Sequence, residues 1–282
     1  MVKVVLIGAG NVATHIGKAL VRSGQQVLQV YSRTAASAQR LASQLQPYPL
    51  STIEAVTSLD RLTNEADLYL ISVKDDALET VIPAACKGRE NRLFIHTAGS
   101  MPTSIFEGHC HRYGVLYPMQ TFSKDKPLDF SKIPLFIEAN SEETTAALEA
   151  LARQLSERVC RLSTASRRQL HLSAVFACNF ANHCYAIAHQ LVQEVGIPFE
   201  VLLPLIDETA DKVHLLPPRQ AQTGPAVRCD EKVMQAQLAL LAHHPLYADI
   251  YRIMSQSIQE VKNDKSPLAC RDAACRVEKV KK

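Results

Sequence analysis

A glycine-rich turn directly after the first apolar segment constrains the fold of this chain more than any other feature. Residues Val2 to Ile7 form a short run typical of a parallel strand buried on both faces. The run leads into Gly8-Ala9-Gly10-Asn11-Val12-Ala13, which has the spacing G-x-G-x-x-A. A helical pattern follows, with Gly24 as its expected C-cap, and Val27 to Tyr31 forms the next expected strand. Strand, turn, helix and strand in this order predict a Rossmann fold.

Each position of this turn has a physical role in binding a dinucleotide. Gly8 permits the tight turn, Gly10 lets the backbone approach a pyrophosphate, and Ala13 allows close packing of helix on strand. The free N–H groups and the dipole at the helix N-terminus favour an anion. The expected pyrophosphate-binding residues are Gly8, Gly10, Asn11 and Val12. A glycine-rich turn without a ligand is the alternative, which the ordered strand–helix–strand context disfavours.

The end of the second expected strand indicates which dinucleotide binds. An NAD-selective site usually places Asp or Glu there to bind the ribose hydroxyls, whereas this chain has Ser32-Arg33-Thr34. A guanidinium makes charge-assisted hydrogen bonds to phosphate, and no carboxylate is present to repel it. These three residues therefore predict a 2′-phosphate site and NADP as the cofactor. A solvated arginine at a strand end is the alternative.

Two further strand ends carry candidate site residues. Leu68–Val73 and Leu93–His96 are expected to be parallel strands, and ligands of such sheets bind beyond the carboxyl ends. Ser72, Val73 and Thr97 are therefore expected to line the nicotinamide side of the cofactor site. His96 has the chemistry to act as an acid or base, although a strand-end histidine can equally be structural.

The second half of the chain changes to helical patterns. The alternation predicts a Rossmann domain with a doubly wound parallel sheet at residues 1–164 and an all-α substrate and dimerisation domain at residues 165–282. One continuous helix is expected over Arg167–Val195. One of its faces would carry His171, Val175, Cys178 and Asn182, with Asn179 beside it. Asn179 is a candidate to bond a substrate carbonyl or the nicotinamide amide. The alternative is a buried helix whose amides satisfy neighbouring backbone groups.

A polar loop supplies another candidate. Thr223–Asp230 contains a glycine-proline turn with a threonine, an arginine and an aspartate directly before an expected helix. Arg228 could clamp an anionic group of a substrate, because loops on rigid elements often carry function. The alternative is a connecting loop in which Asp230 caps the next helix and Arg228 forms a surface ion pair.

Composition excludes several other classes. A net charge of +3 over 282 residues, without a dense basic run among aromatic residues, does not predict a nucleic-acid partner. No apolar run approaches membrane-spanning length, and the first expected strand leaves no room for a signal peptide, so we expect a cytoplasmic protein. The cysteine and histidine spacings do not match a zinc site, and no metal is expected.

Taken together, these motifs resemble a known group: Rossmann-like proteins with a C-terminal helical domain of unknown function. The group is similar to the superfamily of pyrroline-5-carboxylate reductase, ketopantoate reductase and 6-phosphogluconate dehydrogenase. The residues that carry the resemblance are Gly8–Ala13, Tyr31–Arg33, Ser72–Asp75, His96–Gly99, Pro118–Phe122, Val175–Asn182 and Thr223–Asp230. The resemblance implies an NADP-dependent oxidoreductase, a C-terminal domain like that of 6-phosphogluconate dehydrogenase, and a homodimer.

One departure from the superfamily leaves two functions open. Ketopantoate reductases and hydroxyacid dehydrogenases use a lysine four residues before an asparagine, but here those positions hold Val175 and Cys178. Hydride transfer between NADP and a small carbonyl or imine substrate is the first hypothesis, with His96 and Asn179 polarising or protonating the substrate and Arg228 holding an anion. A non-catalytic sensor or partner protein that binds NADP(H) is the second.

Overall fold

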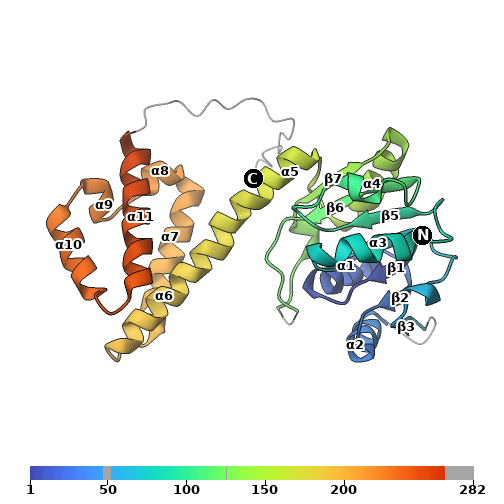
Figure 1. Ribbon diagram of the computed structural model, residues 1–282, viewed down its shortest axis with the longest axis horizontal. Coiled ribbons are helices and arrows are strands. Elements are labelled where there is room, and N and C mark those ends of the chain that lie inside the picture. Colours follow the sequence, from blue (N-terminus) through green and yellow to red (C-terminus); the bar gives the residue numbers. More distant parts are fainter. Residues whose placement is uncertain (47–51, 125, 264–282) are drawn as a thin grey trace. The chain divides into compact units, whose positions relative to one another are not determined.

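The computed structural model describes residues 1–46, 52–124 and 126–263. These residues form two compact units, residues 1–176 and residues 177–263 (Figure 1). The expected boundary after residue 164 marks the change from strands to helices and stays a prediction. The last part of the expected second domain, residues 264–282, lies outside the described residues.

The first unit contains a single sheet with the strand order β3-β2-β1-β4-β5-β6-β7-β8. Neighbours from β3 to β6 are parallel, β7 is antiparallel to β6, and β8 is parallel to β7. The strands are β1 (Lys3–Ile7), β2 (Gln26–Tyr31), β3 (Glu54–Val56), β4 (Leu68–Ile71), β5 (Leu93–His96), β6 (Arg112–Pro118), β7 (Leu135–Ala139) and β8 (Val159–Arg161).

The first six strands have the order 3-2-1-4-5-6 of a dinucleotide-binding fold, which confirms the predicted Rossmann sheet. Among the described strands, β7 departs from the parallel order, because it runs antiparallel to its neighbour β6. No crossover helix is described between β6 and β7, and without one the chain returns beside β6 in the opposite direction.

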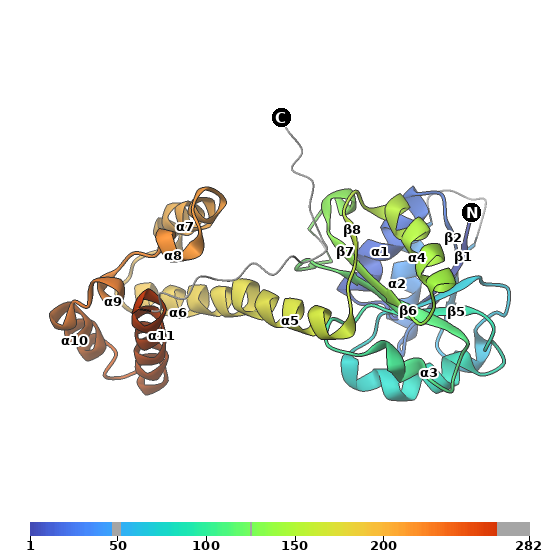
Figure 2. The same ribbon diagram turned by 90° about the horizontal axis from the view of Figure 1, so that it is seen from above.

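Helices cover both faces of the sheet, because alternate residues of each strand point to opposite sides. Val4 and Leu6 pack with α1, α2 and α4, whereas Val5 and Ile7 pack with α3, and Figure 2 shows these two layers. The helices of this unit are α1 (Asn11–Arg22), α2 (Ala35–Leu45), α3 (Leu78–Cys86), α4 (Glu142–Leu155) and α5 (Thr164–Ala174). Short 3₁₀ turns are η1 (Leu59–Arg61), η2 (Asp75–Ala77), η3 (Thr103–Phe106) and η4 (Phe130–Lys132).

The helix expected over Arg167–Val195 is interrupted. A π-helical segment, η5 (Val175–Phe180), lies between α5 and α6 (Ala181–Glu194). A π segment is wider than an α-helix, so the expected face shared by His171 and Asn182 does not continue in α-helical register. Such segments are rare and occur frequently at functional sites.

The second unit is helical, as predicted. The remaining elements are η6 (Phe199–Leu202), α7 (Leu203–Leu215), α8 (Pro218–Ala221), α9 (Pro225–Arg228), α10 (Glu231–Leu240) and α11 (Pro245–Asn263). None of the helices within the described residues combines the length and apolar character needed to cross a membrane.

Candidate functional site

The glycine-rich turn joins β1 to α1 in a conformation that only glycine adopts easily. Gly8 has φ = 118°, and its N–H donates to the Tyr31 carbonyl at 2.8 Å. A Cβ at this position would lie 2.1 Å from the Ser72 carbonyl oxygen. Gly8 therefore brings the ends of β1, β2 and β4 together at the point where the strand order reverses.

The N-terminus of α1 is open to an anion. Gly10 is the N-cap, no side chain caps the helix, and its first turn contains no acidic residue. A Cβ at Gly10 would meet nothing within 4 Å, and both Gly10 and Asn11 are exposed, with Val12 half-buried. The side-chain amide of Asn11 donates to the Phe122 carbonyl at 2.7 Å, which ties this turn to the segment after β6. These features fit a bound pyrophosphate.

The end of β2 presents a second open helix N-terminus. Ser32 continues the strand by donating its N–H to the Val56 carbonyl at 3.1 Å. Arg33 and Thr34 are exposed directly before α2, which has no side-chain cap and no acidic residue in its first turn. Arg33 forms no ion pair with any described residue. A cation at a helix N-terminus without a carboxylate fits a 2′-phosphate.

The ends of β4 and β5 bring two more predicted residues together. The Thr97 hydroxyl donates to the Ser72 hydroxyl at 3.2 Å, and the Thr97 N–H donates to the Ile71 carbonyl. Ser72, Val73 and Thr97 are all half-buried at the carboxyl edge of the sheet. They occupy the region in which open α/β sheets bind ligands.

His96 has a geometry that does not suit proton exchange with a substrate. Its side chain is fully buried, Nε2 lies 3.3 Å from the Pro102 carbonyl, and Nδ1 accepts from the Ala98 N–H at 3.1 Å. Burial, and then the charge of Arg167, lower the pKa of His96 to about 4. Both ring nitrogens of His96 bind backbone groups, so the side chain holds the turn after β5. Neither nitrogen is free to exchange a proton with a substrate, as the predicted acid–base role requires.

A buried arginine fixes helix α5 against that turn. Arg167 is 1 % exposed, and its guanidinium donates to the carbonyls of Ala98, Gly99 and Met101 at 2.7 to 3.0 Å. It also pairs with the Glu138 carboxylate at 3.0 Å. Because the fork of an arginine orients its partners, α5 is held at the carboxyl edge of the sheet.

This anchor places a tyrosine–histidine pair that the sequence analysis missed. The Tyr117 hydroxyl lies 3.0 Å from Nδ1 of His171, and their rings meet edge to face. A Cβ on Gly99 would lie 2.7 Å from the same nitrogen, so glycine is needed for the imidazole to sit there. Tyr117 is near the carboxyl end of β6, and His171 lies one helical turn after Arg167. The four-residue spacing of Arg167 and His171, which places both on one face of a helix, was the signal available in the sequence.

The remaining predicted residues belong to the helical unit. Asn179 is exposed within the π segment, and Arg228 is the exposed last residue of α9. Asp230 accepts from the Val233 N–H at 3.3 Å and caps α10, as the alternative interpretation of this loop expected. Arg228 forms no ion pair with a described residue. Across the described residues, no three His, Cys, Asp or Glu side chains gather where they could hold a metal ion.

Two family models match the chain. Residues 3–99 match the model described as NADP oxidoreductase, coenzyme F420-dependent, and residues 133–258 match a domain of unknown function, DUF2520. A comparison with proteins of curated function gives no match.

Solved structures extend the likeness over nearly the whole chain. The protein BF3122 from Bacteroides fragilis, assigned as an NADP oxidoreductase, is 49% identical with a TM-score of 0.86, covering 92% of this chain and 98% of its own. An imine reductase from Streptomyces aurantiacus (15% identity, TM-score 0.57, 91% and 95% covered) shares the fold. A pyrroline-5-carboxylate reductase from Coxiella burnetii also shares it, with 14% identity and a TM-score of 0.55, covering 93% of this chain and 99% of its own.

Proposed function

This chain belongs to the family of NADP oxidoreductases that join a Rossmann domain of the coenzyme F420-dependent type to a DUF2520 domain, and on that premise we propose that it transfers a hydride between NADP(H) and a small carbonyl or imine compound. The observation that carries the proposal is the pair of open helix N-termini at α1 and α2. Each lacks a capping side chain and an acidic first turn, and Arg33 stands before the second one.

The chain's own residues would bind the cofactor in an extended arrangement along the sheet edge. Backbone amides at Gly10 to Val12 would hold the pyrophosphate, and Ser32 to Thr34 would hold the 2′-phosphate. Ser72, Val73 and Thr97 would line the nicotinamide side. Bound NADPH would supply the hydride that reduces the substrate. NADP in preference to NAD follows from the guanidinium of Arg33 and the missing strand-end acid.

The Tyr117–His171 pair is the best candidate to hold and move the proton of the reaction. A hydroxyl and an imidazole 3.0 Å apart can pass a proton between them, and both lie at the edge where ligands of such sheets bind. We assign this role to the pair in place of His96, whose ring nitrogens bind backbone. Asn179 would orient the substrate, and Arg228 would hold an anionic group on it.

The rival is a protein that binds NADP(H) without catalysis, and the absence of a lysine four residues before Asn179 or Asn182 favours it. A screen of NADPH oxidation against cyclic imines, ketones and aldehydes separates the two. Turnover that falls in His171→Ala, but not in a variant of the exposed His183, supports the oxidoreductase. Tight NADPH binding without turnover of any compound in the screen would favour the sensor.

We also propose that two copies associate through their helical units. Large apolar side chains stand exposed on that unit, among them Leu205, Leu215, Leu240 and Leu246. Exposed apolar side chains in this number favour an interaction site on the unit.

A further inference from the structure

Two cysteines that the proposed reaction does not use meet in the core of the Rossmann unit. Cys86 is the last residue of α3, and Cys110 lies between η3 and β6. Both side chains belong to the buried cluster on the α3 face of the sheet, where they are 1% and 7% exposed. Both are free thiols. The pair therefore places two reduced sulfurs in one shared apolar environment.

The side chains of the two cysteines are in contact. The Cys86 thiol hydrogen-bonds with Cys110, and the Cys110 sulfur lies 3.9 Å from the Arg112 carbonyl oxygen. The two segments are also tied by their backbones, because the His111 N–H donates to the Glu90 carbonyl at 2.8 Å. Sulfurs in hydrogen-bond contact need only a small further approach to reach the disulfide bond length of about 2.05 Å.

Each cysteine stands at the end of an element, beside a glycine turn. Gly88 follows Cys86 by two residues and has φ = 75°. Gly108 precedes Cys110 by two residues and has φ = 77°. A Cβ at either glycine would meet nothing within 4 Å, so neither turn is packed against the core. The two turns can therefore take up the small backbone shift that disulfide geometry requires without disturbing the sheet.

The contact assigns different roles to the two thiols. The hydrogen bond with Cys110, and then burial, raise the pKa of the Cys86 thiol, so Cys86 keeps its proton at neutral pH. Because the thiolate is the nucleophile, Cys86 is not the sulfur that attacks an oxidant first. Cys110 is the more exposed of the two and takes that role. Cys86 is then the neighbouring thiol that resolves the oxidised product.

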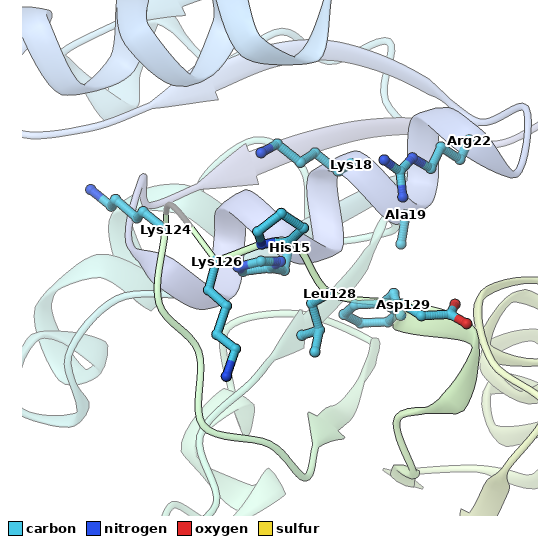
Figure 3. A pocket seen from close by; sticks show the side chains of 10 residues that line it. His15, Lys18, Ala19, Arg22, Lys124, Lys126, Leu128 and Asp129 are labelled. Atoms are coloured by element: carbon cyan, nitrogen blue, oxygen red, sulfur yellow. The ribbon is translucent and has the colours of Figure 1, made fainter. Parts of the chain in front are cut away.

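The packing around the pair selects a small oxidant. The cavity of Figure 3 gives no access to the thiols, because it is lined by Ala19 and Phe130 of the cluster on the opposite face of the sheet. The slight exposure of Cys110 admits a molecule of the size of hydrogen peroxide more readily than a peptide disulfide. Burial also slows the reaction, so the pair would respond to sustained oxidation.

We propose that Cys86 and Cys110 form a reversible disulfide when a small peroxide oxidises the protein. The Cys110 thiolate attacks one peroxide oxygen, the O–O bond breaks, and a sulfenic acid and one water form after protonation. The Cys86 sulfur then displaces the hydroxyl group, which leaves as a second water with the Cys86 proton. Two thiols thus lose two electrons and two protons, and one peroxide becomes two waters.

The disulfide would close a segment that carries part of the candidate site. Residues 86–110 contain β5 and the turn with Thr97 and Gly99. A bridge at the two ends of this segment restricts the unfolded chain more than the folded one, and therefore stabilises the Rossmann unit. This role needs only the geometry of the two cysteines and does not rest on hydride transfer.

Peptide mapping of the full-length protein tests the proposal. The reduced protein is treated with hydrogen peroxide, blocked with iodoacetamide in urea, digested with trypsin and analysed by mass spectrometry. Trypsin cuts after lysine and arginine, so the disulfide joins peptides 75–87 and 93–112. We expect this joined pair after oxidation, and its loss when the oxidised protein is reduced with dithiothreitol.

Thermal unfolding of the same samples gives a second readout. Oxidation should raise the Tm of the Rossmann unit by about 10 °C, because the bridge restricts the unfolded chain. Cys86→Ala and Cys110→Ala should each lose this rise when the oxidised variant is compared with its own reduced form. Cys178→Ala, at an exposed cysteine, is the matched control and should keep the rise.

Several results would overturn the proposal. These are recovery of Cys86 and Cys110 in separate peptides after oxidation, a bridge from either one to a different cysteine, or a bridge that forms only when urea is present during oxidation. A rise in Tm that persists in Cys86→Ala would contradict it as well. None of these outcomes bears on the proposed oxidoreductase function, which the NADPH titration and the substrate screen test separately.

Discussion

The two units of this protein differ in how much of their apolar surface they cover. In the Rossmann unit, Val5, Ile7 and Phe94 are completely buried between sheet and helices. In the helical unit, α6, α7, α8 and α10 contain no buried side chain, and Leu215 and Leu240 are 83% and 80% exposed. Since burying a leucine contributes about 1.5–3 kcal/mol, the helical unit leaves a large part of its hydrophobic stabilisation unrealised within one chain.

This difference separates the interactions that stabilise the two units. The Rossmann unit is specified by local patterns that one copy can satisfy: short apolar strands, glycine turns and helix caps. The helical unit carries exposed large apolar side chains, which we propose are covered by a second copy of the chain. We therefore expect the cofactor site to depend on residues of the first unit and assembly to depend on the second, and the following predictions test that division.

The largest effect is expected for the proton-handling pair of the first unit. Replacing His171 by alanine should reduce kcat about 100- to 10,000-fold, because general acid–base groups contribute in that range. NADPH affinity should stay unchanged. Steady-state kinetics with a compound found in the substrate screen measures it.

Gly99→Ala gives an independent check of the same pair. The added methyl group displaces the imidazole, so kcat should fall as in His171→Ala. Full activity in both variants would exclude the pair from the reaction.

A buried histidine should make the Rossmann unit sensitive to acid. The unfolded chain takes up a proton near the ordinary histidine pKa of 6.5, whereas buried His96 stays neutral down to about pH 4. The free energy of unfolding should therefore decrease by about 2 kcal/mol between pH 7 and pH 5 from this residue. Urea denaturation at both pH values measures it.

His96→Gln should be less stable at pH 7, yet lose less stability on acidification. The exposed His111→Gln is the matched control and should behave like the unmodified protein. An identical pH response in all three proteins would contradict the account of His96.

Assembly should respond to the apolar face of the second unit. Replacing Leu240 and Leu246 by aspartate should weaken dimerisation about tenfold or more, since two exposed leucines are lost and two charges are introduced. Sedimentation equilibrium measures the dissociation constant, and Gln235→Asp on α10 controls for added charge. A monomer in the unmodified protein would remove the proposed dimer.

The smallest effect concerns one backbone position in the helical unit. Cys229 follows α9 with φ = 56°, the left-handed region that favours glycine. Cys229→Gly should raise the free energy of unfolding by about 1 kcal/mol, with Cys184→Gly within α6 as a destabilising control. Thermal unfolding measures both variants, and we expect a higher melting temperature for Cys229→Gly and a lower one for Cys184→Gly.

The success of sequence reasoning followed the range of the interactions. The positions of the turn at Gly8 to Ala13 and of Ser32-Arg33-Thr34 at the end of β2 were predictable because strand, turn and helix lie next to one another in the chain. Phosphate binding by these segments stays a prediction. The pair of Tyr117 and His171 was not, since 54 residues separate its members and β6 and α5 must pack before they meet. The burial of His96 could not be predicted either, because it depends on the turn after β5, which no local pattern reveals. Without that burial, an acid–base role for His96 is a reasonable hypothesis.

The most direct test of the central claim is a titration of the purified protein with NADPH and NADH, followed by nicotinamide fluorescence. We predict tighter binding of NADPH, a loss of NADPH affinity of about tenfold or more in Arg33→Ala, and little change for NADH. Arg40→Ala, an exposed arginine farther along α2, should preserve the preference. Equal affinity for the two nucleotides, or a preference that survives in Arg33→Ala, would contradict the 2′-phosphate site.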